Sequence, residues 1–289
     1  MKRPDTRNRA HQRERVISAE TEPGHASAGL FALWTHRTLL WDFIARDLKR
    51  RYTGSSIGFF WTVITPLLEL VTYTFVFHGL LKIDFHPAAG WTHYALFLFS
   101  GMVTWLMVSD GLSHATISIS NHAHLIKKAP FPSIVLPAHL VFSATLNQGI
   151  RMIILIVAAL LFSGGISALV LLIPFVMVVQ TALTLGLGLL LATANVYFRD
   201  TNHWVSAMML LWMFLTPVFY PAASYPKEFI LALQLNPLAH LVGIYRELIL
   251  NSSMPHPNAM IIVTVMSGLI LLIGYSVFHH HQSKFADLV

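Results

Sequence analysis

Four cations just ahead of the first long apolar segment are the most informative charged residues of this chain. They are Arg46, Lys49, Arg50 and Arg51. Lysine and arginine beside a membrane span resist translocation and stay on the cytoplasmic side. Phe43, Ile44 and Leu48 are interleaved with these cations. We therefore predict a helix on the inner membrane surface, with these three side chains in lipid and the cations at phosphate depth.

Three charged residues interrupt the apolar segments that follow: Glu69, Asp110 and Arg151. A charge costs ~3 kcal/mol or more at the bilayer centre, so each should face protein or water. On one interpretation Glu69 and Asp110 line a polar path. On the other, one of them pairs with Arg151 or caps a helix. Glu69 is the stronger functional candidate because Pro66, three residues earlier, removes a backbone hydrogen bond and loosens the helix.

Aromatic residues cluster at the ends of the apolar segments, where interfacial anchoring explains most of them. Trp105, Trp212 and Phe214 lie further from the ends. Sugars stack on aromatic faces, so these three residues are candidates for lining a glycan path.

The basic loop at residues 120–137 contains three prolines. We expect a short helix over 122–128 that projects from the membrane and docks into a soluble partner; a plain tight turn is the alternative. His122, His124 and the triplet 279–281 suggest a metal site. However, neither group has carboxylates or further ligands at a defined spacing, so we expect no metal site.

Composition indicates a membrane protein. Apolar residues make up 55% of the chain and charged residues 11%, against about 25% charged in soluble domains. There is no cysteine, so disulfides and thiolate metal sites are excluded. Of the 19 lysines and arginines, 11 lie within residues 1–51. Ahead of a membrane span, this basic excess favours a topology signal over nucleic-acid binding.

The fold prediction is an all-α integral membrane protein with six spans, each needing roughly 20 apolar residues. The predicted spans are residues 57–81, 91–118, 134–162, 169–196, 203–220 and 259–278. We predict a disordered tail at 1–28 and one transmembrane domain at 29–289, beginning with an interfacial helix at 33–54. We predict two short outer helices at residues 225–250, because Asn236-Pro237 breaks this segment in the middle.

Loop charges favour this topology with both termini in the cytoplasm. It places 15 cations inside and three outside, the latter being Lys82, Lys227 and Arg246. The sequence contains no GxxxxGK[ST], GxSxG or HExxH motif. Nucleotide binding through a P-loop and hydrolase chemistry are therefore not expected. Energy for pumping must come from another subunit or an ion gradient.

Six motifs in order resemble ABC-2 type polysaccharide-export permeases, the membrane subunits of O-antigen, capsule and teichoic-acid exporters. The resemblance covers residues 33–289. The motifs are RDLKRRYTGSSIGFFWTVITPLLELVTYTFVF (46–77), KKAPFPSIVLP (127–137), NVYFRD (195–200), TPVFYP (216–221), NPLAHLVGIYRELIL (236–250) and KFADLV (284–289). The first motif looks closest to the O-antigen and teichoic-acid branch.

The resemblance implies a homodimer in the bacterial inner membrane, paired with two ATPase subunits that bind ATP and magnesium. A lipid-linked glycan would pass between the protomers. This chain would hold no cofactor, perform no catalysis and bind no nucleic acid. The alternatives are an ABC-2 exporter of drugs or small lipids, a capsule exporter, an intramembrane enzyme using Glu69 or Asp110 as base, and an ion-coupled transporter.

The resemblance also implies three groups of site residues. Carrier-phosphate binding at a gating helix would involve Arg46, Lys49, Arg50, Arg51 and Tyr52. The translocation path would involve Glu69, Tyr73, Trp105, Trp212 and Phe214. Coupling to the ATPase would involve His122, His124, Leu125, Lys127 and Lys128.

Overall fold

A computed structural model describes residues 31–52, 58–80, 82, 90–128, 131–162, 165 and 167–289. Every regular element in these ranges is a helix, which confirms the predicted all-α fold. The predicted tail at residues 1–28 lies outside the described residues.

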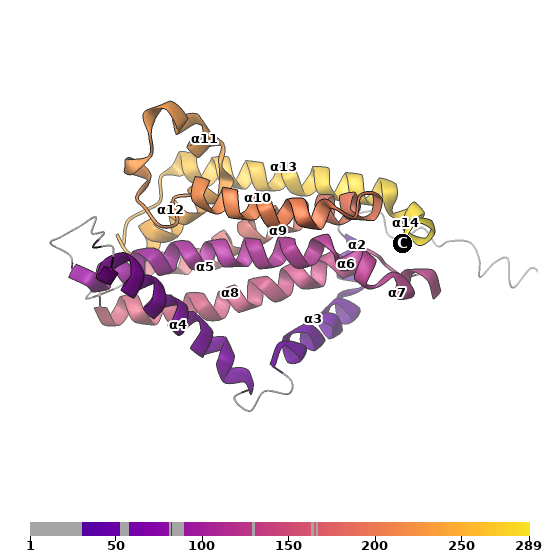
Figure 1. Ribbon diagram of the computed structural model, residues 1–289, viewed down its shortest axis with the longest axis horizontal. Coiled ribbons are helices and arrows are strands. Elements are labelled where there is room, and N and C mark those ends of the chain that lie inside the picture. The colour runs from indigo at the N-terminus through magenta and orange to yellow at the C-terminus, as the bar shows by residue number, and fades with distance from the viewer. Residues whose placement is uncertain are drawn as a thin grey trace, which may run out of the picture.

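Four helices are long and apolar enough to cross a bilayer. They are α5 (Gly90–Thr116), α8 (Val135–Phe162), α9 (Ile173–Tyr197, preceded by the 3-10 turn η4 at Ala168–Leu172) and α13 (Pro257–His281). They run alongside one another as the body of the molecule (Figure 1). Each exceeds the roughly 20 residues needed to span the hydrocarbon core. They coincide with the second, third, fourth and sixth predicted spans.

The first and fifth predicted spans are shorter. Helix α4 (Trp61–Thr74) follows the turn η1 (Gly58–Phe60) and continues as the π-helical segment η2 (Phe75–Leu80). Helix α10 (Thr201–Leu215) has 15 residues, about 22 Å at 1.5 Å per residue. It ends because Thr216 is extended and Pro217 has no amide hydrogen.

Six full spans are therefore not confirmed. The described part of the chain has four candidate spans, or five if one bent helix pair is counted.

That bent pair is α11 (Ile230–Leu235) and α12 (Pro237–Ile249), which meet at 87°. The short turns η5 (Ala222–Ser224) and η6 (Lys227–Phe229) lead into it. Asn236 makes the corner: its side chain accepts a hydrogen bond from the amide of Leu238, and Pro237 starts the second helix. The pair lies at one end of the bundle (Figure 1).

The opposite end carries α6 (Ser118–Asn121), α7 (Ala123–Lys128) and α14 (Phe285–Leu288), which follows the turn η7 (Gln282–Lys284) (Figure 1). Phe285 is fully buried, with its ring 5.1 Å from that of Phe278. Helix α7 lies within the short helix predicted at 122–128.

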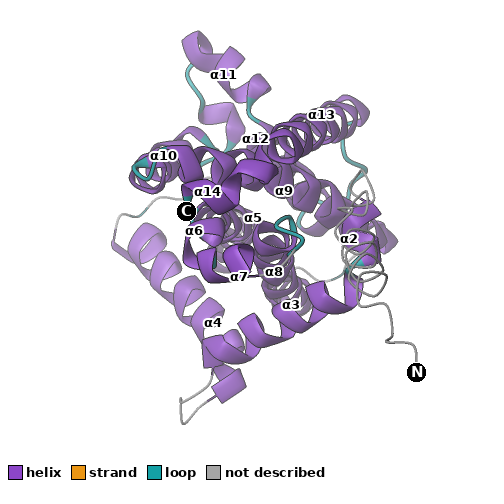
Figure 2. Ribbon diagram, turned by 90° about the vertical axis from the view of Figure 1, so that its right-hand side faces the viewer, coloured by secondary structure: helices purple, strands orange, loops and turns teal. Residues whose placement is uncertain are grey.

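Helix α2 (Phe31–Thr35) and helix α3 (Arg37–Tyr52) replace the single helix predicted at 33–54. Together α3 and α4 form an angled arm beside the bundle (Figure 2).

Candidate functional site

Phe43 and Ile44 fix α3 against the bundle. The Phe43 ring lies 5.1 Å from the ring of His139 on α8 and 5.9 Å from that of Phe131. Ile44 is only 3% exposed. The prediction that these two side chains lie in lipid is therefore wrong. The apolar face of α3 is covered by α8 and its preceding loop, so burial against protein replaces burial in the bilayer.

The cations of α3 lie on its other faces. Arg46, Lys49 and Arg50 are exposed, and the Arg46 guanidinium carbon lies 5.9 Å from the centre of the Phe43 ring. The side chains of Arg51 and Tyr52 lie outside the described residues. Protein contacts thus hold the helix while its exposed cations remain accessible to phosphate groups.

Helix α7 presents a compact surface of histidine and lysine. His124 and Lys127 are exposed, Leu125 is half-buried, and the Lys128 side chain lies outside the described residues. His122 precedes the helix and its Nδ1 lies 2.9 Å from the carbonyl oxygen of Ser118. No group of three histidine, aspartate or glutamate residues in the described ranges has metal-binding geometry. The surface is suited to contact with a protein.

The aromatic candidates form two separate groups of ring contacts. Tyr73 of α4 and Phe214 of α10 both approach Phe219, with ring centres 6.0 and 6.1 Å away. Phe214 is 57% exposed, so this group offers an open aromatic surface that connects α4 with the end of α10.

Trp105 and Trp212 face each other instead, 6.2 Å apart and edge to face. Trp105 is 5% exposed, and the Trp212 indole nitrogen donates a 3.0 Å hydrogen bond to Asn236 Oδ1. These two indoles therefore join α5 and α10 to the corner between α11 and α12. Trp105 is buried in this arrangement, whereas Trp212 is half-buried.

The three membrane-level charges lie on three helices, and two of them share a pocket. Asp110 of α5 and Arg151 of α8 line one polar pocket of about 180 Å³. Arg151 also acts electrostatically on Glu69 of α4, whose Oε2 is buried without a hydrogen-bond partner in the described part of the chain. His114 Nδ1 lies 3.3 Å from Asp110 Oδ1. The sequence supplied these residues, but only the packing shows that Asp110 and Arg151 line the same pocket.

Arg246 of α12 is a site residue that sequence reasoning counted only as a charge on the outer side. It is 8% exposed. Its guanidinium donates hydrogen bonds of 2.7 Å to the carbonyls of both Pro217 and Val218 and one of 3.2 Å to that of Phe97. It also stacks 3.5 Å from the centre of the Phe97 ring. Arg246 therefore joins α12 to α5 and to the segment after α10.

A neutral polar network lies next to Arg246 along α12. The Tyr245 hydroxyl donates to Gln180 Oε1 at 3.0 Å, and Gln148 Nε2 donates to the same oxygen at 2.8 Å. Gln180 in turn donates to the carbonyl of Thr104. Both Tyr245 and Arg246 follow Leu238, Leu241 and Val242 at helical spacing. This amphipathic pattern of α12 is the sequence signal for their burial.

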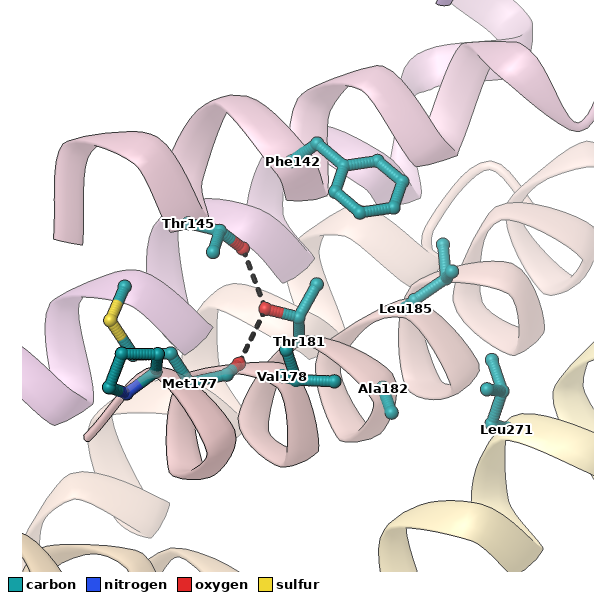
Figure 3. A pocket seen from close by; sticks show the side chains of 9 residues that line it. Phe142, Thr145, Met177, Val178, Thr181, Ala182, Leu185 and Leu271 are labelled. Atoms are coloured by element: carbon teal, nitrogen blue, oxygen red, sulfur yellow. Dashed lines mark hydrogen bonds between the residues drawn. The ribbon is translucent and has the colours of Figure 1, made fainter. Parts of the chain in front are cut away.

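An apolar groove of about 420 Å³ lies among α8, α9 and α13 (Figure 3). Among the described residues that line it, Thr145 and Thr181 carry the side-chain hydroxyls, which bond to each other at 2.9 Å (Figure 3). Thr181 also lies 2.7 Å from the Met177 carbonyl oxygen. Because both hydroxyls have protein partners, the groove has no free polar group to orient a polar ligand. It is suited to hydrocarbon.

These features define a class: a multi-pass helical membrane protein with charged groups at membrane depth and a bent helix pair at one end. Residues 38–250 match the family model described as ABC-2 type transporter. The chain therefore belongs to the ABC-2 type transporter family.

Curated relatives match over nearly their full length. The O-antigen export system permease protein of Myxococcus xanthus is 30% identical over 89% of this chain and 97% of its own. A protein of the same description from Klebsiella pneumoniae is 28% identical, over 84% of this chain and 92% of its own. The polysialic acid transport protein of Escherichia coli is 18% identical, over 82% of this chain and 91% of its own.

Proposed function

We propose that this chain is the transmembrane subunit of an ATP-driven exporter that moves a lipid-linked polysaccharide outward across the bacterial inner membrane. The observation that carries this proposal is its similarity to O-antigen export permeases along almost the whole chain, at 30% identity for one of them. The polysialic acid transport protein is more distant, at 18%. An O-antigen-like polymer is therefore favoured over a capsular one.

Energy for this transport comes from a separate ATPase. The chain has no P-loop sequence, and the ABC-2 family supplies membrane components. Two copies of the chain pair with two ATPase subunits, which bind ATP and magnesium. Helix α7 is the coupling surface on this chain, through His122, His124, Leu125, Lys127 and Lys128. Its short projecting form at the end of the bundle supports this role (Figure 1).

Substrate entry involves α3. Phosphate of the carrier lipid is attracted by Arg46, Lys49, Arg50 and Arg51, with Tyr52 at the end of the helix. The contacts of Phe43 and Ile44 with the bundle support this role, because they hold the cations in a fixed place. Charge-assisted bonds to phosphate are about twice as strong as neutral hydrogen bonds.

The glycan passes along α4 and α10, which both carry exposed apolar side chains at membrane depth. Leu68 and Val71 of α4 and Leu210 and Phe214 of α10 are each more than half exposed. A second copy of the chain covers these faces and completes the path. Glu69, Tyr73 and Phe214 contact the moving polymer, and Trp105 and Trp212 do so when the outer helices open.

Six membrane crossings follow if α4 with η2, and α10, cross together with the four long helices. Both chain ends then lie in the cytoplasm. The short α10 crosses with help from the bent α11–α12 pair, which fills the outer leaflet where protein covers its backbone. The excess of cations on the inner side supports this orientation.

The test is co-purification in detergent with an ATPase encoded beside this chain, followed by ATP hydrolysis with and without lipid-linked glycan. The carrier lipid without glycan, and a hydrophobic drug, are the matched controls. Stimulation by the glycan-lipid alone supports the proposal. A complex that responds only to drugs or small amphiphiles indicates the drug or lipid branch. Transport driven by an ion gradient, or turnover without an ATPase, rejects the proposal.

A further inference from the structure

A polar pocket lies at membrane depth between α5 and α8. Its lining consists of Leu106, Ser109, Asp110, Ser113 and Arg151. The first four recur at intervals of three and four residues, so they occupy one face of α5. Arg151 comes from α8, which packs antiparallel to it. Two hydroxyls, a carboxylate and a guanidinium therefore converge on about 180 Å³ of space.

This pocket is too polar to face hydrocarbon. The side chains of Asp110 and its neighbour His114 are 26% and 48% exposed, although both lie in a candidate span. Charged groups in a span occur facing protein or a water-filled cavity, because hydrocarbon cannot solvate them. At about 30 Å³ for each water molecule, the pocket has room for several waters. This recess therefore has the size and the polarity to hold water.

Glu69 does not line the recess but belongs to the neighbouring helix. It projects from α4, which packs on both α5 and α8. Its Oε2 is buried and has no hydrogen-bond partner in the described ranges. Buried carboxylate oxygens are nearly always paired, so an unpaired one indicates a donor supplied from elsewhere. A hydroxyl group of a transported molecule, or water in its absence, is such a donor.

We propose that this recess is a saccharide-binding station, occupied by successive sugar units as the glycan moves past α4. This inference rests on the proposed function and adds residues to it. Asp110 and Glu69 accept hydrogen bonds from sugar hydroxyls, while Arg151, Ser109 and Ser113 donate to sugar oxygens. The mixture of donors and acceptors suits a hydroxyl-rich polymer. A sugar that binds here replaces its hydrogen bonds to water with hydrogen bonds to the protein, so the net gain in binding free energy is small. Each sugar unit therefore binds weakly and can leave.

Thiol labelling tests the recess directly, because the chain has no natural cysteine. Ser113→Cys places a thiol in the recess. Val178→Cys is the matched control, since Val178 is 67% exposed but lines the apolar groove of Figure 3. The reagent is a membrane-impermeant, positively charged methanethiosulfonate, applied to the ATPase complex in vesicles. We expect faster labelling at Ser113→Cys by about tenfold, because reaction requires an ionised, hydrated thiol.

Protection identifies the occupant. Lipid-linked glycan should slow labelling of Ser113→Cys by several-fold, and the carrier lipid without glycan should not. In addition, Asp110→Asn should raise the glycan concentration for half-maximal ATP hydrolysis by about fivefold. A change of this size corresponds to the loss of one ordinary hydrogen bond, because the amide nitrogen of Asn cannot accept one.

Three outcomes overturn the inference. Equal labelling of the two cysteines means that the recess is dry. Rapid labelling that glycan does not slow, in a complex whose ATP hydrolysis glycan still stimulates, means that the recess holds water only. If glycan does not stimulate ATP hydrolysis by the cysteine-free complex, the proposed function itself is rejected, and the saccharide-binding station is rejected with it.

Discussion

Gly186 of α9 and Gly274 of α13 face each other at a crossing that leaves no room for a side chain. A Cβ atom built on Gly186 would lie 2.6 Å from the backbone of Ile270, and one built on Gly274 would meet the backbone of Gly186. Membrane helices lack a hydrophobic driving force for association, so close backbone approach at small residues stabilises their contact. This crossing joins α13 to the rest of the bundle.

Substitution of Gly274 should therefore loosen the bundle. Gly274→Ala forces the two backbones apart, and overpacking of this kind costs about 1–3 kcal/mol. We expect a lower melting temperature and lower yield in detergent. Gly268→Ala is the control, because it makes the same change on the same helix where no atom lies within 4 Å. Equal melting temperatures for the two variants would contradict the close contact.

Replacement of Arg246 should release α12. Arg246→Met keeps a long side chain but removes the donors to Phe97, Pro217 and Val218. Each carbonyl left unpaired away from water costs about 1–3 kcal/mol. Thermal stability in detergent should fall, and proteolysis should become faster in the outer helices. Lys227→Met is the control, since Lys227 is exposed on the same outer segment. Unchanged protease sensitivity in Arg246→Met would show that the guanidinium does not hold α12.

Charge reversal on α3 should impair export. In Arg50→Glu/Arg51→Glu, two carboxylates replace cations proposed to bind carrier phosphate, so phosphate is repelled rather than attracted. Export of glycan in cells should fall by at least about tenfold, while the dimer remains intact on size-exclusion chromatography. Arg50→Lys/Arg51→Lys keeps the charge and should retain most export. Normal export by the Glu pair would reject the phosphate role.

Glu69 should matter for transport rather than for folding. Glu69→Leu removes the carboxylate and leaves a shorter, apolar side chain. Expression and melting temperature should change little, because Arg151 keeps the carboxylate of Asp110 beside it in the same polar pocket. Glycan-stimulated ATP hydrolysis should fall severalfold. Glu69→Gln keeps the hydrogen-bonding shape and serves as the comparison. A stable and fully active Leu variant would make Glu69 purely structural.

Local pattern was sufficient for much of the fold. Apolar segments of span length predicted the helices α5, α8, α9 and α13. A helix that crosses a bilayer needs about 20 apolar residues, whichever helices it packs against. The Asn236–Pro237 break gave the corner between α11 and α12. The same reasoning overestimated α10, because the apolar run was counted through Pro217, where the helix has already ended.

The sequence by itself determined the all-helical class, the membrane location of the long helices and the types of charge available at membrane depth. These follow from composition and spacing along one segment. Tertiary structure alone decided that Phe43 meets α8 rather than lipid, that Arg246 is buried among carbonyls, and that Asp110 and Arg151 share one recess. Helical periodicity shows which residues share a face, but the packing of distant helices determines what covers that face.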